Sequence, residues 1–166
     1  MTLSGGKAHQ FGARELRDAL GCFATGVIVV TGVDSDGCLI GVTVNSFASV
    51  SLDPPLVSFC LGKSLRSRER IATTKGFALN VLREDQGCLS VQFAAEEIDK
   101  WHNIDYRRGI HAAPVIEPNL AVFQCLKYAE FECGDHVIII GRVEAFEHDD
   151  KEAPLIFHRG GYRQLL

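Results

Sequence analysis

A run of neutral polar residues is the first part of the sequence that suggests chemistry. Between Gly37 and Leu52 there is no charged residue, although this stretch is rich in hydrogen-bonding side chains. In a single strand, alternation puts on one face the side chains of Thr43, Asn45, Phe47, Ser49 and Ser51. A solvent face normally carries Lys or Glu, and a buried face does not hold so many polar groups without partners. The pattern indicates a face for an uncharged heterocycle; the alternative is a strand whose hydroxyls bond to neighbouring backbone.

A cluster of positive charge follows one strand later. From Lys63 to Lys75 there are five positive residues against one negative residue, in a protein of net charge −4. Ser64 stands where it is expected to cap the next helix, so free backbone N–H groups and the guanidinium of Arg66 are expected to meet at one phosphate. The alternative is a solvated helix face. Together, the neutral face and the basic turn match the two halves of a nucleotide cofactor site.

Two further segments carry groups of interest. His136 follows a Gly134-Asp135 turn and precedes an apolar strand, and a second group lies in Phe157–Tyr162. Each is also compatible with an ordinary turn. No metal site is predicted, because the six histidines include no H-x-x-x-H pair and none lies near two cysteines.

Composition limits the class of protein. The chain has 166 residues, 46% of them hydrophobic and 23% charged, which is typical of one folded domain. The net negative charge disfavours nucleic acid as a partner. Six cysteines without a C-x-x-C pair, no signal-like start and no apolar run of membrane length predict a cytoplasmic protein with no membrane partner.

The expected elements are mostly strands. A helix is expected around Leu16, Leu20 and Phe23, and residues 1–10 are expected to be a flexible N-terminus before a single domain over 11–166. The expected strands cover 26–33, 39–52, 56–61, 77–82, 120–131 and 137–146, the expected helices cover 64–74, 84–95 and 96–101, and residues 103–118 are expected to form a loop. This order predicts a mainly β protein, a barrel with peripheral helices.

Taken together, the segments resemble the short flavin reductase family, the split-barrel NAD(P)H:flavin oxidoreductases that serve two-component monooxygenases. The likeness extends from about Phe11 to Tyr162, and the long central segment ending in two prolines is its most specific part. The segments that carry it are Phe23–Val27, Gly41–Leu56, Phe77–Leu82, Gly134–His136 and Arg159–Tyr162.

The resemblance implies a homodimer of split β-barrels that binds FMN or FAD near the subunit interface. It implies flavin ring and ribityl contacts for Thr43, Asn45, Ser46 and Ser49. It implies phosphate contacts for Cys60, Ser64 and Arg66, and a flavin cover for Phe93.

For NADH or NADPH, the resemblance implies nicotinamide contacts by His136, Arg159 and Tyr162. His136 is the candidate catalytic residue, although hydride transfer depends on ring positioning more than on an acid or base. Cys133 departs from the family pattern, which often has Gly before Gly-Asp-His.

The implied activity is hydride transfer from NAD(P)H to flavin, with the reduced flavin passed to a partner oxygenase. Two alternatives stay open: a flavin-binding split-barrel protein without turnover, and a related oxidase of a phosphorylated pyridoxal-type substrate. An oligonucleotide-binding barrel is less compatible, because Lys63–Lys75 contains no aromatic residue for base stacking.

Overall fold

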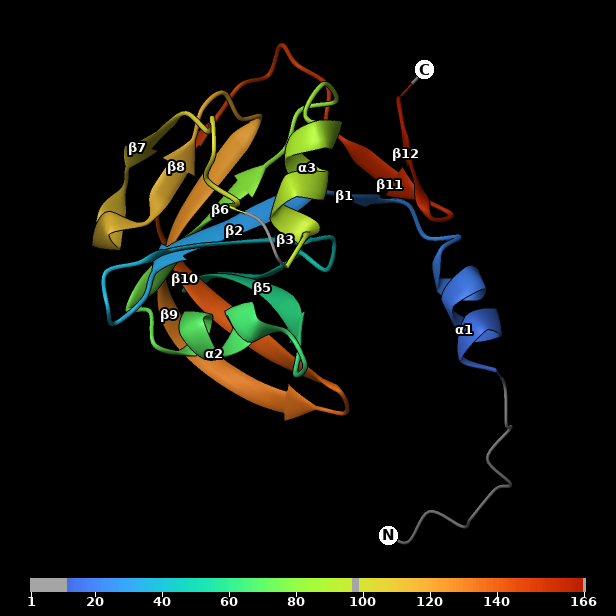
Figure 1. Ribbon diagram of the computed structural model, residues 1–166, viewed down its shortest axis with the longest axis horizontal. Coiled ribbons are helices and arrows are strands. Elements are labelled where there is room, and N and C mark those ends of the chain that lie inside the picture. The colour runs from blue at the N-terminus through green and yellow to red at the C-terminus, as the bar shows by residue number, and fades with distance from the viewer. Residues whose placement is uncertain (1–11, 97–98, 166) are drawn as a thin grey trace, which may run out of the picture.

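The computed structural model describes residues 12–96 and 99–165, so the predicted flexible segment 1–10 lies outside the described residues. The helices are α1 (Ala13–Leu20), α2 (Arg66–Ala72), α3 (Gly87–Ala94) and the short 3-10 helix η1 (Ile110–Ala112). The strands are β1 (Thr25–Gly26), β2 (Ile28–Val33), β3 (Leu39–Val44), β4 (Ala48–Leu52), β5 (Pro55–Gly62), β6 (Gly76–Val81), β7 (Tyr106–Arg108), β8 (Pro114–Ile116), β9 (Ala121–Cys133), β10 (His136–His148), β11 (Ile156–His158) and β12 (Gly161–Arg163). The prediction of a mainly β protein is confirmed (Figure 1). None of the described helices is long and apolar enough to cross a membrane.

A seven-stranded sheet forms the body of the molecule. Its strand order is β3-β2-β6-β9-β10-β5-β4, so β3 and β4 are its two edges and the sheet does not close through hydrogen bonds. Ser46, in the link between these edges, bridges to β5: its hydroxyl accepts a hydrogen bond from the Cys60 amide at 2.9 Å and donates to the Cys60 carbonyl at 3.3 Å. A side chain therefore fixes the link between β3 and β4 onto β5, the neighbour of the β4 edge.

The predicted strand over 39–52 is wrong in one respect. β3 ends at Val44 and β4 starts at Ala48, and the two strands lie at opposite edges of the sheet. The alternation therefore does not hold Thr43, Asn45 and Ser49 on one strand face. The adjacent polar residues Asn45 and Ser46 interrupt the polar–apolar alternation, and both are common in turns, but without a glycine or proline this signal for the break is weak.

The helical predictions are partly confirmed. α2 and α3 lie inside the predicted ranges 64–74 and 84–95. The predicted cap is wrong: Leu65, not Ser64, precedes α2, and no side chain caps that helix. The predicted helix over 96–101 is wrong in its described part, where a turn forms and the Trp101 amide donates to the Asp99 carboxylate at 3.1 Å.

Two small sheets were not predicted. Within the expected loop 103–118, β7 and β8 pair antiparallel around η1. At the other end of the molecule, β1, β11 and β12 form a three-stranded sheet next to α1 (Figure 1). Strands of two or three residues leave too little periodicity to be recognised from sequence.

Buried contacts fix the sheet and α3 in place. Phe59 and Phe77 meet edge-to-face in the core, with ring centroids 5.1 Å apart. Phe93 anchors α3 over β3, because a Cβ at Gly41 would overlap its ring. Glycine at 41 therefore allows α3 to pack directly on the sheet edge.

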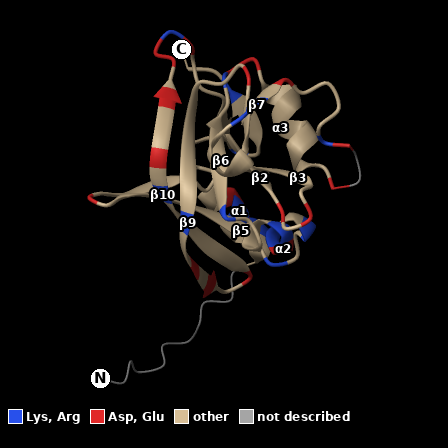
Figure 2. Cartoon of the chain, turned by 90° about the vertical axis from the view of Figure 1, so that its left-hand side faces the viewer, with Lys and Arg blue, Asp and Glu red and all other residues tan. Residues whose placement is uncertain are grey.

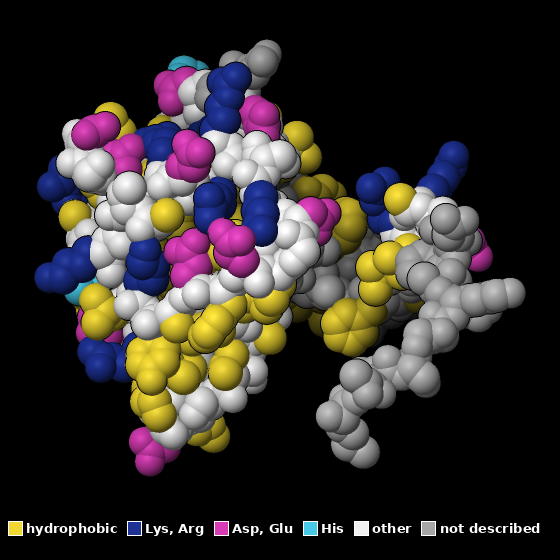
Figure 3. Space-filling model, turned by 90° about the horizontal axis from the view of Figure 1, so that it is seen from below, with side chains coloured by type: hydrophobic (Ala, Val, Ile, Leu, Met, Phe, Trp, Pro, Cys, Tyr) yellow, Lys and Arg dark blue, Asp and Glu magenta, His cyan; other side chains and the backbone are white. Residues whose placement is uncertain are grey.

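Some apolar surface is left uncovered in the single chain. No residue of α1 is buried, and Leu20 and Phe23 are 65% and 77% exposed. Figure 3 shows apolar side chains on the part of the molecule where α1 lies and a second apolar patch on the underside of the main body.

Candidate functional site

A large cavity lies between α1, β1 and the end of β3. It encloses about 650 Å³, and we call it the Asn45 cavity; its lining includes Asn45, Thr25, Cys22, Phe157 and Arg159. Asn45 is exposed there, and its amide has no hydrogen bond with any described residue. The Thr25 hydroxyl oxygen is buried and also lacks a partner among the described residues. The cavity therefore presents polar groups whose hydrogen bonds the protein does not use.

A smaller cavity of about 230 Å³ adjoins it, and we call it the Tyr162 cavity. Its lining includes Thr43, Ser90 and Tyr162, and it shares Asn45 and Phe157 with the Asn45 cavity. The Thr43 hydroxyl donates to the Ser90 carbonyl at 2.6 Å, and the Tyr162 hydroxyl donates to the Ser90 hydroxyl at 2.7 Å. Phe157 and Tyr162 meet at a centroid distance of 5.9 Å. Flat aromatic walls and neutral polar groups suit a planar heterocycle.

Two of the predicted flavin contacts use their hydroxyls to bond to backbone, which is the alternative that the sequence left open. Thr43 bonds to backbone on α3, and Ser46 bonds to backbone on β5. Ser49 is exposed on the edge strand β4, and Cys60 is partly buried on β5. Asn45 is thus the predicted flavin residue whose polar atoms remain available in the cavity.

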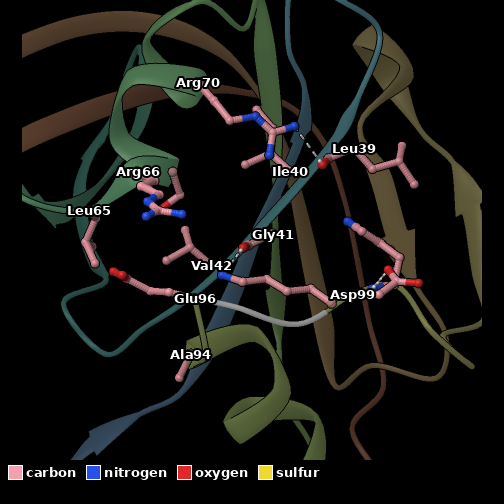
Figure 4. A pocket seen from close by; sticks show the side chains of 13 residues that line it. Leu39, Ile40, Gly41, Val42, Leu65, Arg66, Arg70, Ala94, Glu96 and Asp99 are labelled. Atoms are coloured by element: carbon pink, nitrogen blue, oxygen red, sulfur yellow. Dashed lines mark hydrogen bonds between the residues drawn. The ribbon is translucent and has the colours of Figure 1, made fainter.

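The basic turn lines a third cavity, which encloses about 380 Å³ between α2, β3 and the segment after α3; we call it the Arg66 cavity (Figure 4). Arg66 extends from α2 into this space, and Glu96 reaches toward the same space from the segment after α3. Arg66 is exposed and forms no ion pair with the described residues. Figure 2 shows the positive charge concentrated on α2.

The other cations of the Arg66 cavity have structural partners. Arg70 donates to the Asp34 carboxylate at 2.8 Å and to the Leu39 carbonyl at 3.1 Å. The Arg70 hydrogen bond holds the pKa of Asp34 below its usual range. Lys100 donates to the carbonyls of Gly41 and Phe93, and burial lowers its pKa. Arg70 and Lys100 thereby cover the open edge of β3.

Phe93 does not lie where a residue that covers the flavin is expected, at the wall of a cavity. Its ring is fully buried, contacts Trp101 edge-to-face at 5.1 Å, and lines no described cavity. In this conformation it has no exposed surface to place against a ligand. Its role in the single chain is to anchor α3.

The three predicted nicotinamide residues lie in two places. Arg159 and Tyr162 come from the β11–β12 hairpin, where the Arg159 amide donates to the Gly21 carbonyl at 2.9 Å. His136 starts β10, opposite Gly62 at the end of β5, and its Nδ1 lies 2.8 Å from the Asp135 carboxylate. This contact lowers the pKa of Asp135. No described cavity is lined by both His136 and Tyr162, so the single chain does not bring the three residues together.

Two residues of this region were missed from the sequence. Thr25 lies within the Phe23–Val27 segment, which was noticed only as part of the resemblance. Ser90 is 1% exposed in the middle of α3, where a serine has no helix-forming advantage. A small polar residue between the apolar residues Leu89 and Val91 was the available signal.

The geometry fits a flavin. A tricyclic ring with donors and acceptors along one edge matches the Asn45 amide and the Thr25 hydroxyl, which have no partner among the described residues, and the aromatic walls. A phosphate matches the guanidinium of Arg66, which forms no ion pair with the described residues.

Comparisons with known proteins point to the same ligand. The "Flavin reductase like domain" family matches residues 20–166. A protein of Rhizobium meliloti (strain 1021) named "Probable flavin reductase" is 48% identical over 155 residues, 93% of this chain and 50% of its own length. The flavin-dependent monooxygenase reductase subunit HsaB of Mycobacterium tuberculosis is 39% identical, over 92% of this chain and 82% of its own.

A solved structure agrees in fold. The NADH:FAD oxidoreductase SgcE6 of Streptomyces globisporus C-1027, in complex with NAD and FAD fragments, superposes with a TM-score of 0.87 at 34% identity and 92% coverage of both chains. The present chain spans only half the length of the first of these relatives and most of the length of the other two. The resemblance read from the sequence is confirmed, and the chain belongs to the flavin reductase like domain family.

Proposed function

We propose that this protein is a flavin reductase that uses NADH or NADPH to reduce FMN or FAD. The observation that carries the proposal is the Asn45 cavity, which combines aromatic walls with neutral polar groups that have no partner in the described part of the chain, in a member of this family. A flavin ring in this space would supply the hydride acceptor next to the nicotinamide. The protein's own contribution is to position the two rings and exclude water.

The residues divide this work between two walls. Asn45 offers both a donor and an acceptor, which suit a ring edge that becomes negative on reduction. Thr43 is held on β3 by the Ser90 carbonyl, and Tyr162 faces it from β12. The phosphate is expected at Arg66, with Ser64 and Cys60 as the other contacts that the family resemblance implies.

We further propose a partner oxygenase and a homodimer. The relative HsaB is named a reductase subunit of a flavin-dependent monooxygenase, which supports transfer of reduced flavin to a second protein. The uncovered apolar residues Leu16, Leu20 and Phe23 around α1 support a second copy of this chain as the cover. Sedimentation of the purified protein tests the dimer: a monomer at micromolar concentration would contradict it.

The reductase activity is tested by following NADH absorbance with and without added FMN or FAD. We expect oxidation only when flavin is present. If flavin binds and NADH is not oxidised, the protein is a flavin-binding protein without turnover. If a phosphorylated pyridoxal amine or alcohol is oxidised instead, the related oxidase is correct.

A further inference from the structure

Ser90 connects the two walls between which the rings are expected to meet. Its carbonyl accepts from Thr43 on β3, and its hydroxyl accepts from Tyr162 on β12. The residue is 1% exposed. Burying a serine hydroxyl without a partner is destabilising, so the contact with Tyr162 is what makes serine acceptable here.

The helix that carries Ser90 is fixed at both ends. Near its start, the Gln86 side chain accepts from the Arg83 amide and donates to the Pro118 carbonyl. Near its end, Gln92 donates to the carbonyls of Lys100 and His102. Together with the Phe93 ring against Gly41, these contacts make α3 a rigid support.

The wall that carries Tyr162 is held much more lightly. β12 is a three-residue strand that pairs only with β11 among the described strands. Within the described residues, the Tyr162–Ser90 contact is the one side-chain hydrogen bond that joins β12 to another helix or strand. Tyr162 also forms part of the wall of a cavity on its other side, with Gly87, Leu155 and Arg163. The ring of Tyr162 meets Phe157 of its own hairpin and otherwise borders cavities, so the hydrogen bond to Ser90 is what fixes its position relative to α3.

From this contrast we infer that Ser90 is a positioning residue for hydride transfer. It holds Tyr162 at a fixed distance from β3 and so sets the width of the Tyr162 cavity, where the nicotinamide ring is expected. The inference rests on the proposed reductase function and extends it to a residue that touches neither ring. Because the Thr43 bond uses the Ser90 carbonyl, Ser90→Ala removes the link to Tyr162 and leaves the link to Thr43 intact. The flavin side is therefore expected to stay unchanged.

The test compares Ser90→Ala, Tyr162→Phe and the double variant in steady-state NADH oxidation and in flavin binding by fluorescence. We expect each single variant to raise the KM for NADH, or to lower the rate of hydride transfer, about threefold to tenfold, the range of one hydrogen bond. The double variant should lose no more than either single variant, because both remove the same contact. Flavin affinity should stay within twofold of wild type.

Cys88→Ala is the matched control, since it removes one side-chain heavy atom from the same helix. Cys88 is exposed and makes no hydrogen bond with the described residues, so this variant should behave as wild type. A second measurement follows amide hydrogen exchange in β12, which should become faster in Ser90→Ala and Tyr162→Phe but not in the control.

The outcomes separate the two proposals. If wild type oxidises NADH and Ser90→Ala matches the control in kinetics, the positioning role is overturned while the reductase function stands. Additive losses in the double variant, or an equal loss of flavin affinity, also overturn it. If wild type shows no flavin-dependent NADH oxidation, the proposed function fails and the positioning role fails with it, whatever the exchange rates show.

Discussion

Two cavities lie on either side of α3 along the edge of β3, and they use their polar groups differently. Ala94 lines both the Arg66 cavity and the Tyr162 cavity, so one helix separates them. On the Arg66 side, Arg70 and Lys100 bond to Asp34 and to backbone carbonyls. On the other side, Thr43 and Tyr162 bond to Ser90, whereas Asn45 and the Thr25 hydroxyl of the adjoining Asn45 cavity have no partner among the described residues.

The difference distinguishes polar groups that stabilise the fold from polar groups that are available to bind a ligand. A charged group that covers open backbone carbonyls already contributes to folding, and a ligand would have to replace those bonds. A neutral group without a partner gains a hydrogen bond when a ligand arrives. By this criterion Asn45 is the strongest binding residue near the β3 edge, and Arg66 is the one arginine of α2 that has no partner within the described chain.

The largest expected effect tests the helix that separates the two sides. Phe93→Ala should lower the free energy of unfolding by about 3–5 kcal/mol, because it leaves a cavity where a fully buried ring packs on Gly41 and Trp101. Chemical denaturation measures this loss. A variant of normal stability that binds flavin poorly would instead make Phe93 the flavin cover that the resemblance implies.

The same substitution can be made at two asparagines, one whose side-chain amide has no hydrogen bond with the described residues and one whose amide is fully hydrogen-bonded. Asn45→Leu should weaken flavin binding by about 1–3 kcal/mol and leave stability unchanged. Asn80 is fully buried and bonds to Val29, Thr31 and Ile116, so Asn80→Leu should lower stability by at least as much without acting on the ligand directly. Fluorescence titration and urea unfolding of both variants decide the matter. Equal flavin affinity in Asn45→Leu and wild type would reduce Asn45 to a surface residue.

His136 provides a test that depends on geometry beyond the single chain. His136→Ala should raise the KM for NADH or slow hydride transfer by tenfold to a hundredfold, roughly the range expected for a misplaced ring, with little change in flavin affinity. The structure places His136 beside Gly62, on the Arg66 side of the molecule. A large loss of flavin affinity with normal NADH dependence would therefore assign His136 to the phosphate end of the flavin.

The strands of the large sheet were predictable because their apolar residues run continuously. Val27–Val30 and Phe77–Leu79 are each fully or almost fully buried, and such runs are typical of strands covered on both faces. The Asp34 turn was predictable as well, since its carboxylate accepts from the amides of Asp36 and Cys38.

Contacts between distant segments were not predictable. Nothing near Arg70 in the sequence shows that Asp34 and Leu39 occupy it, so the basic run could not be divided into free and engaged charges. The same applies to Thr43, whose partner Ser90 lies 47 residues away. The sequence identified the polar residues, whereas the fold decides which of them remain available to a ligand.

The smallest expected effect distinguishes two arginines of one helix. Arg66→Ala should weaken FMN binding about twofold to fivefold and riboflavin binding little, because only FMN carries the phosphate, and an exposed ion pair contributes at most about 1 kcal/mol. Arg70→Ala is the matched control: its guanidinium is already bound to Asp34 and Leu39, so its loss should lower stability without separating the two ligands. Titrations at low and high salt complete the test, since screening should reduce the Arg66 effect. Equal losses of affinity for FMN and riboflavin in Arg66→Ala would remove this residue from the phosphate site. A larger loss of FMN affinity in Arg70→Ala would show that a charge already paired within the fold can still bind a ligand.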